Sequence, residues 1–129
     1  MPRYLSPEWF DAAQRAAAGN AALQAATVGA HVIVEHEVTG GPDGDVRFHV
    51  VVDDGSVEIV NAPAPEPTVT FVQSYETAAA IGKGELSAQG AFLIGQLRVR
   101  GDLPKLVDEM DAFAGVDDLF DGLQAQTDY

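Results

Sequence analysis

The sequence predicts an α+β fold in which helices cover one face of a five-stranded, mainly antiparallel sheet. Helical patterns occupy residues 6–29 and most of the chain after residue 74, strand patterns of period two occupy residues 31–73, and the two-residue alternation returns once more at residues 96–101. Strands joined by tight turns pair antiparallel, and each amphipathic helix must bury its apolar face against the sheet.

The first element is a helix with a well-defined start. Ser6 is a suitable N-cap, Pro7 stands at the first helical position, and Glu8 places negative charge at the positive end of the helix dipole. Gly19 ends this helix. The Ala-rich stretch NAALQAAT continues as a second short helix.

Four strands are predicted next. The stretch HVIVEHEV, residues 31–38, places three valines and His36 on one face and His31, an isoleucine and two glutamates on the other. GGPDGD is a turn, and VRFHVVVDDGSVEIV forms two strands around Asp54 and Gly55, the strongest hairpin signal in the chain. Three prolines make APAPEP a crossing connection, which leads into the fourth strand, TVTFVQ.

Two short helices then precede a fifth strand. Ser74 and Ser87 are suitable N-caps, and glycines end both helices. In QLRVRG, Leu97 and Val99 point inward while the two arginines point outward. The two helices must lie over the sheet to bring this strand back beside its partners.

The last predicted helix follows Asp102, which caps it, and ends at Gly115, with its apolar residues on one stripe. VDDLFDGLQ then predicts a short tail helix. From Ala125 onward the chain is expected to be loose.

Charge and composition narrow the function classes. Seven Lys plus Arg oppose 20 Asp plus Glu, a net charge of −13, which argues against nucleic acid and anionic membrane surfaces as partners. The absence of cysteine excludes disulfides, thiolate metal sites and cysteine nucleophiles. No apolar run is long enough for a signal peptide or a membrane helix, so a soluble cytoplasmic protein is expected.

The polar residues form no strong catalytic or metal motif. His36 lies on the opposite strand face from His31, so the two cannot bind one ion, and only a weak site of His31, His49 and Glu35 is conceivable. All three histidines are instead expected on solvated strand faces. Adjacent carboxylates are explained by turns and polar helix faces, and no serine lies in a GxSxG elbow. We therefore expect no catalytic residue, metal or cofactor.

Arg98 and Arg100 form the one basic cluster near the last strand. They would either attract a carboxylate or phosphate headgroup or pair with Glu35, Glu37 or Glu58 across the sheet. The excess of acidic residues favours the ion pairs.

The stretch VTFVQSYETAAAIGKGELSAQGAFLIGQLRVRGDLPKL, preceded by FHVVVDDGSVEIV and a proline-containing connection, resembles the sterol carrier protein type two domain, a small lipid-binding module. The resemblance covers residues 31–115 of a single domain, 1–129, and leaves 1–29 as an N-terminal helical segment and 116–129 as a tail. It implies an apolar tunnel between sheet and helices and no catalytic residues. Family members bind sterols, fatty acids or acyl-CoA, alone or beside a lipid-metabolising enzyme.

When the segments of this sequence are matched to those of the family, the resemblance implies that ten apolar residues line the tunnel. These are Phe71, Ala79, Ile81, Phe92, Leu93, Leu97, Val99, Leu106, Met110 and Phe113. Each would fit an ordinary core equally well, so only a cavity distinguishes the two interpretations. The chain lacks the peroxisomal tripeptide and basic surface of some family members. The N-terminal helix with Trp9 and Phe10 is either a lid or plain packing.

These observations favour a non-enzymatic carrier, a monomer or weak dimer, that holds a fatty acid, an acyl-CoA or a sterol-like molecule. One alternative is a small pocket enzyme in which an acidic residue and Tyr75 act on a steroid-like or acyl substrate. Another is an interaction module that packs on a lipid-metabolising enzyme or on itself.

Overall fold

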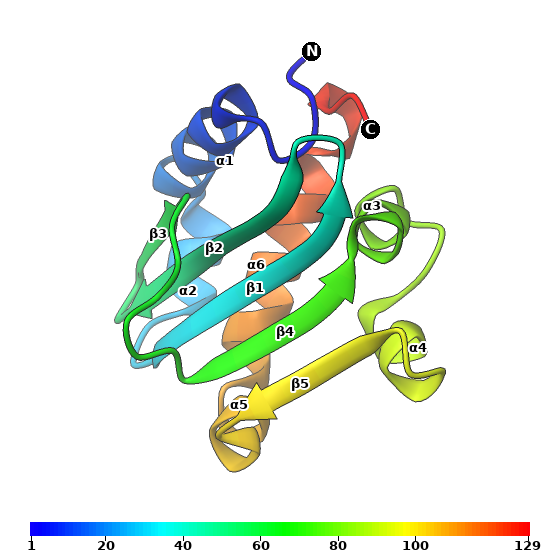
Figure 1. Cartoon of the computed structure of the whole chain (residues 1–129). Coiled ribbons are helices and arrows are strands. Elements are labelled where there is room, and N and C mark those ends of the chain that lie inside the picture. The colour runs from blue at the N-terminus through cyan, green and yellow to red at the C-terminus, as the bar shows by residue number, and fades with distance from the viewer.

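The computed structural model describes all residues, 1–129, and contains a five-stranded sheet in the order β3-β2-β1-β4-β5 (Figure 1). Its strands are β1 (His31–Gly41), β2 (Gly44–Asp53), β3 (Ser56–Val60), β4 (Val69–Ser74) and β5 (Leu97–Gly101). β1 and β4 run parallel, and the other three neighbouring pairs are antiparallel. The prediction of a five-stranded, mainly antiparallel sheet is confirmed.

The proline-rich connection, residues 61–68, produces the parallel pair. It leaves β3 at one edge and passes over β2 and β1 to place β4 beside β1 (Figure 1). Two polar side chains of the sheet hold it: His49 Nδ1 lies 2.6 Å from the Ala62 carbonyl oxygen, and the Ala64 N–H donates to Glu35 at 2.8 Å. The connection therefore covers part of the outer sheet face.

Six α-helices and one 3-10 turn accompany the sheet. They are α1 (Pro7–Ala18), α2 (Ala21–Ala26), α3 (Tyr75–Gly82), α4 (Ala88–Leu93), α5 (Leu103–Asp108), α6 (Met110–Gly122) and η1 (Gln124–Gln126). Four predicted N-caps accept a hydrogen bond from the backbone N–H three residues later: Ser6, Ser74, Ser87 and Asp102. None of the helices combines the length and apolar character needed to cross a membrane.

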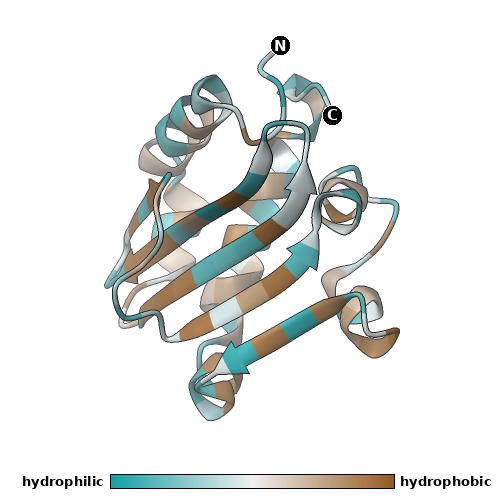
Figure 2. Cartoon of the chain, viewed as in Figure 1, coloured by the Kyte–Doolittle hydropathy of each residue, from teal (hydrophilic) through white to brown (hydrophobic).

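α1, α2 and α6 lie behind the sheet in the view of Figure 1, on its inner face. The two-residue period along β1 sets this arrangement, because Val32, Val34 and Val38 point inward and are all buried. The facing residues of β2 on the same side are also apolar. Figure 2 shows the resulting alternation of apolar and polar residues along the central strands.

The predicted helix end at Gly115 is wrong, because α6 runs through this residue to Gly122. The interruption comes earlier, at Glu109, between α5 and α6. A Cβ atom added at Gly115 would lie 3.0 Å from the Ala26 Cβ atom and 3.3 Å from Leu23 Cδ1. Gly115 thus permits the close approach of α6 to α2 and does not stop the helix.

The expectation of a loose C-terminus is also wrong. Thr127 is buried, and its hydroxyl accepts a hydrogen bond from Trp9 Nε1 at 3.1 Å. The Asp128 N–H donates to the Pro2 carbonyl, and the Asp128 carbonyl accepts from the Tyr4 N–H, both at 2.8 Å. Since Trp9 is itself buried in the core, the N-terminal helix packs as part of the domain.

Candidate ligand-binding site

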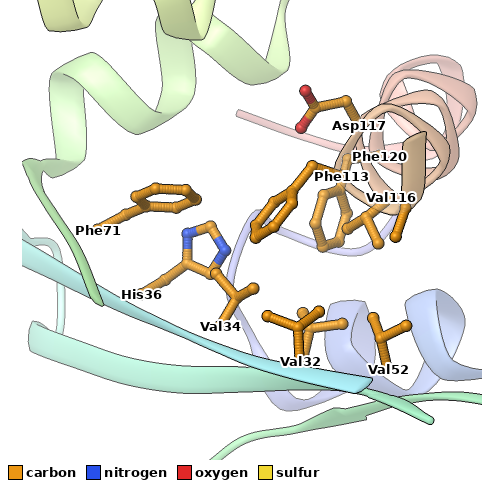
Figure 3. A pocket seen from close by; sticks show the side chains of 11 residues that line it. Val32, Val34, His36, Val52, Phe71, Phe113, Val116, Asp117 and Phe120 are labelled. Atoms are coloured by element: carbon orange, nitrogen blue, oxygen red, sulfur yellow. The ribbon is translucent and has the colours of Figure 1, made fainter. Parts of the chain in front are cut away.

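An apolar crevice lies between the inner face of the sheet and α6 (Figure 3). It is lined by 11 residues, nine of them hydrophobic. The sheet contributes Val32, Val34, His36, Val50, Val52 and Phe71, and α6 contributes Ala112, Phe113, Val116, Asp117 and Phe120. The strand residues share a face through the two-residue period, and the helix residues share one through the helical repeat.

The crevice is nearly closed. Its cavity volume is about 30 Å³, room for no more than about one or two water molecules. Aromatic side chains fill the space from both walls: the ring centroids of Phe71 on β4 and Phe113 on α6 are 6.2 Å apart. Small-molecule sites occupy roughly 300–1,000 Å³, so a lipid would require α6 and the sheet to separate.

A wider groove runs along α1, α2 and β3, with a volume of about 670 Å³. It is open to solvent, and only four of its nine lining residues are hydrophobic. A groove of this kind would leave an apolar chain in contact with water, so the crevice under α6 is the better candidate for an apolar ligand.

His36 is one of the two titratable residues that line the crevice. Its ring stacks on Phe48 with centroids 4.7 Å apart and planes at 4°. It also lies near Phe71 (Figure 3), which it meets edge to face at 5.3 Å. Desolvation by these apolar neighbours lowers the pKa of the imidazole to about 4, so the ring is neutral at pH 7. The residue is half-buried, and no side-chain hydrogen bond within the protein engages either ring nitrogen.

The expectation of a solvated strand face is therefore wrong for His36. It is also wrong for His49, which is buried under the proline-rich connection. His31 is exposed and lies 2.9 Å from Asp53. The conceivable metal site does not form, because His31 lies opposite Asp53, whereas Glu35 lies opposite His49.

Asp117 is the second titratable residue of the crevice. It lies on the solvent side of α6, where its side chain is exposed at the mouth. Partial burial, and then the neighbouring charges of Asp121 and Asp118, raise the pKa of its carboxyl group to about 6. No lysine or arginine lines the crevice. The mouth is consequently anionic at neutral pH.

The ten residues predicted for the tunnel wall occupy three kinds of position. Two line the crevice: Phe71 and Phe113. Five lie outside it and are buried or half-buried: Ala79, Ile81, Leu97, Val99 and Leu106. Three are exposed: Phe92 at 54%, Leu93 at 82% and Met110 at 50%. The structure thus brings together a wall from β4 and α6 but not the α4 part.

Of the 11 residues that line the crevice, the resemblance to the family predicts only Phe71 and Phe113. The two-residue alternation indicates the shared strand face of the four valines of β1 and β2, and it groups His36 on the same face. Val116 and Phe120 were assigned to a separate tail because α6 was expected to end at Gly115.

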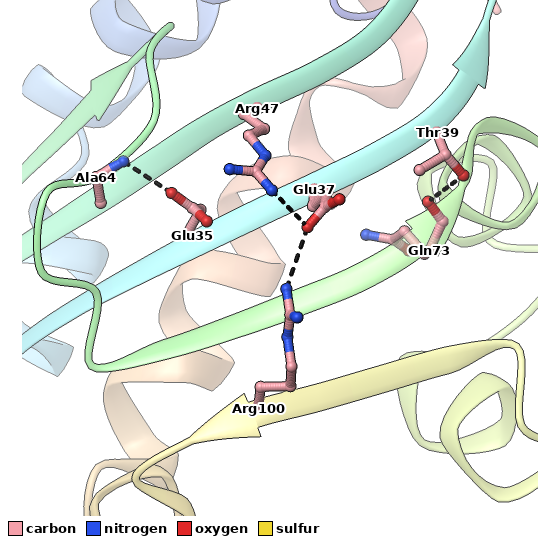
Figure 4. A network of polar contacts seen from close by, with 7 residues as sticks. All are labelled: Glu35, Glu37, Thr39, Arg47, Ala64, Gln73 and Arg100. Atoms are coloured by element: carbon pink, nitrogen blue, oxygen red, sulfur yellow. Dashed lines mark hydrogen bonds and ion pairs between the residues drawn. The ribbon is translucent and has the colours of Figure 1, made fainter.

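The outer face of the sheet carries a polar network that is directed away from the crevice (Figure 4). Glu37 Oε2 accepts from Arg100 Nη2 at 3.2 Å and lies 3.1 Å from Arg47 Nη2. Thr39 donates to the Gln73 carbonyl at 3.5 Å. Arg100 therefore pairs with an acidic neighbour, as the charge count favoured, and does not reach the crevice.

A model of the SCP-2 sterol transfer family matches residues 10–113. A crystal structure of sterol carrier protein 2 superposes with a TM-score of 0.75 and 16% identity, covering 92% of this chain and 98% of that one. A conserved hypothetical protein of Thermus thermophilus superposes with a TM-score of 0.74 and 15% identity, covering 95% of this chain and 91% of that one. A palmitated sterol carrier protein 2-like protein of Aedes aegypti superposes with a TM-score of 0.52 and 18% identity, covering 66% of this chain and 72% of that one.

At these identities the solved structures show a common fold. Among curated proteins, none matches the sequence.

Proposed function

The chain belongs to the SCP-2 sterol transfer family, and we propose that it is a non-enzymatic carrier that holds a single lipid in the crevice under α6. A lipid-binding or lipid-transfer role follows from this membership. The observation that carries the proposal is the crevice itself. Nine of its 11 lining residues are hydrophobic, and none is a lysine or an arginine. Such a lining favours an alkyl chain or a ring system over a polar metabolite.

Binding requires the crevice to open, and α6 is the element suited to move. Its C-terminal half is anchored: Leu119 and Leu123 are buried, and Phe120 stacks on Trp9 at 5.9 Å. Its N-terminal turn is less constrained, because Met110 is 50% exposed and the helix is interrupted at Glu109. We propose that this N-terminal half swings outward to admit the ligand.

An outward movement of α6 also gives a role to the predicted wall residues that lie beside the closed crevice. Leu106 packs at the edge of the core, and Val99 is half-buried on the inner face of β5. Met110, unbranched and polarizable, adapts readily to a ligand of changing shape. In the open state these side chains would extend the apolar wall toward β5.

The experiment is native mass spectrometry of the purified chain, followed by solvent extraction and titration with palmitate, the ligand named for the Aedes relative. A matched pair of variants tests the location. Phe113→Asp places a charge inside the crevice and should abolish binding, whereas Phe92→Asp places the same charge on α4, outside the crevice. Equal affinity of both variants and wild type would rule out the crevice as the site.

The interaction module is a second candidate because α4 and its C-cap expose three consecutive apolar residues, Phe92, Leu93 and Ile94. Light scattering would detect a dimer that buries them. The enzyme alternative has less support, since Tyr75 packs near Tyr4, at a centroid distance of 5.8 Å, and does not line the crevice.

A further inference from the structure

We propose that His36 determines ligand specificity, and that it binds an uncharged hydroxyl group at the buried end of the lipid. This inference rests on the proposed function, because it concerns the same crevice. It predicts which of the ligand classes compatible with an apolar cavity the protein selects: monohydroxy lipids over carboxylates and acyl-CoA.

The first argument is the unused hydrogen-bonding capacity of the inner sheet face. The His36 ring is half-buried and lines the crevice against Phe48 and Phe71, and no side-chain hydrogen bond within the protein engages its nitrogens. A lipid that fills the crevice would remove the His36 ring from water, so a ligand that offers this ring a hydrogen bond is favoured over one that does not.

The second argument is the protonation state of the ring. A neutral imidazole offers one N–H donor and one bare nitrogen acceptor. A hydroxyl group likewise offers one donor and accepts at its oxygen, so the two groups are complementary. A carboxylate, in contrast, only accepts and is stabilised best by charged donors. The residues around His36 supply none, because no lysine or arginine lines the crevice.

The third argument is the charge at the mouth. Asp117 lies at the crevice opening with Asp118 and Asp121 close enough to interact with it electrostatically. An anionic headgroup left at the mouth would face these carboxylates, in a chain whose net charge is −13. The phosphates of acyl-CoA would be repelled more strongly than a single carboxylate. Both possible positions of an anionic headgroup, deep or at the mouth, are thus unfavourable.

The test compares three ligands of equal chain length with the full chain at pH 7.5: hexadecan-1-ol, its methyl ether and hexadecanoic acid. Trp9, the single tryptophan, stacks on the crevice residue Phe120, so its fluorescence reports binding without a label. We expect the alcohol to bind about tenfold or more tightly than the ether, the magnitude of one buried hydrogen bond, and more tightly than the acid.

Three variants then assign the preference to one residue. His36→Phe should reduce the ratio of alcohol to ether affinity to about one. His36→Gln keeps a donor and an acceptor and should retain part of the preference. His31→Phe, on the exposed face of the same strand, should behave as wild type. If His36→Phe fails to give a cooperative melt, the wild-type ligand series and His36→Gln still decide the question.

Each outcome is decisive. Equal binding of alcohol and ether by the wild type would overturn this inference while leaving the lipid carrier intact, as would acid binding as tight as alcohol binding. A full preference in His36→Phe would overturn the assignment to His36. If none of the three lipids binds, the carrier function fails and the inference fails with it.

Discussion

Protonation of His36 should make the folded protein less stable in mild acid. Its pKa is about 4 in the fold against 6.5 for an ordinary histidine. Between these values the unfolded chain binds the additional proton, so stability falls as the pH is lowered through this window. The pKa difference limits the effect to about 3 kcal/mol, of which about 2 kcal/mol should appear between pH 7 and pH 5.

The assay is urea unfolding, followed by Trp9 fluorescence at several pH values, on wild type and His36→Phe. Wild type should lose about 2 kcal/mol more than the variant between pH 7 and pH 5. Asp117, the other titratable group of the crevice, acts in the opposite direction, because its raised pKa favours the protonated fold below about pH 6. The comparison removes this contribution, since both proteins contain Asp117. Parallel pH profiles would refute the assignment of a buried neutral ring to His36.

Three further changes probe the packing around the crevice by urea unfolding. Gly115→Val should lower the free energy of unfolding by about 1–3 kcal/mol, because the added side chain meets α2. The control Gly122→Ala, where no atom lies within 4 Å of the added Cβ, should be neutral or stabilising by up to about 1 kcal/mol. Equal effects of the two substitutions would refute a close contact between α2 and α6. Thr127→Val should lower the free energy of unfolding by about 1–3 kcal/mol, since it leaves the buried indole N–H of Trp9 without its acceptor. An unchanged midpoint of urea unfolding would show that the C-terminus is not docked. Arg100→Ala should lower the free energy of unfolding by less than about 1 kcal/mol, because the ion pair of Arg100 with Glu37 is exposed. It should leave palmitate affinity unchanged, because this pair lies on the face opposite the crevice. A clear loss of affinity would support the hypothesis that Arg100 binds a ligand headgroup.

The strands and the helix starts could be predicted because they depend on local chemistry. The alternation of HVIVEHEV placed Val32, Val34 and His36 on one face, and the structure confirms that division. Ser74 and Ser87 cap their helices through hydrogen bonds to backbone groups three residues away, an interaction visible within a short stretch of sequence.

The misplaced residues depend on contacts between distant segments. Gly115 has the composition of a helix end, but its role is set by Ala26, almost ninety positions earlier. The alternation predicts the correct face for His36, but residue type alone predicts a solvated position, whereas burial depends on what packs over the strand. The signal was present, since the three valines that share its face could belong only to the inner side.

A closed crevice is consistent with a carrier that must release its ligand. Burying a methylene group contributes about 0.8 kcal/mol, so a 16-carbon chain that entered a preformed dry cavity would gain about 13 kcal/mol and would dissociate very slowly. Here Phe71 and Phe113 occupy the space themselves. A lipid bound in the proposed site would replace these protein contacts with lipid contacts, so only the difference between the two would contribute to affinity. In the proposed cycle, closure of α6 onto the sheet after release would stabilise the empty protein and limit the exposure of its apolar wall to water.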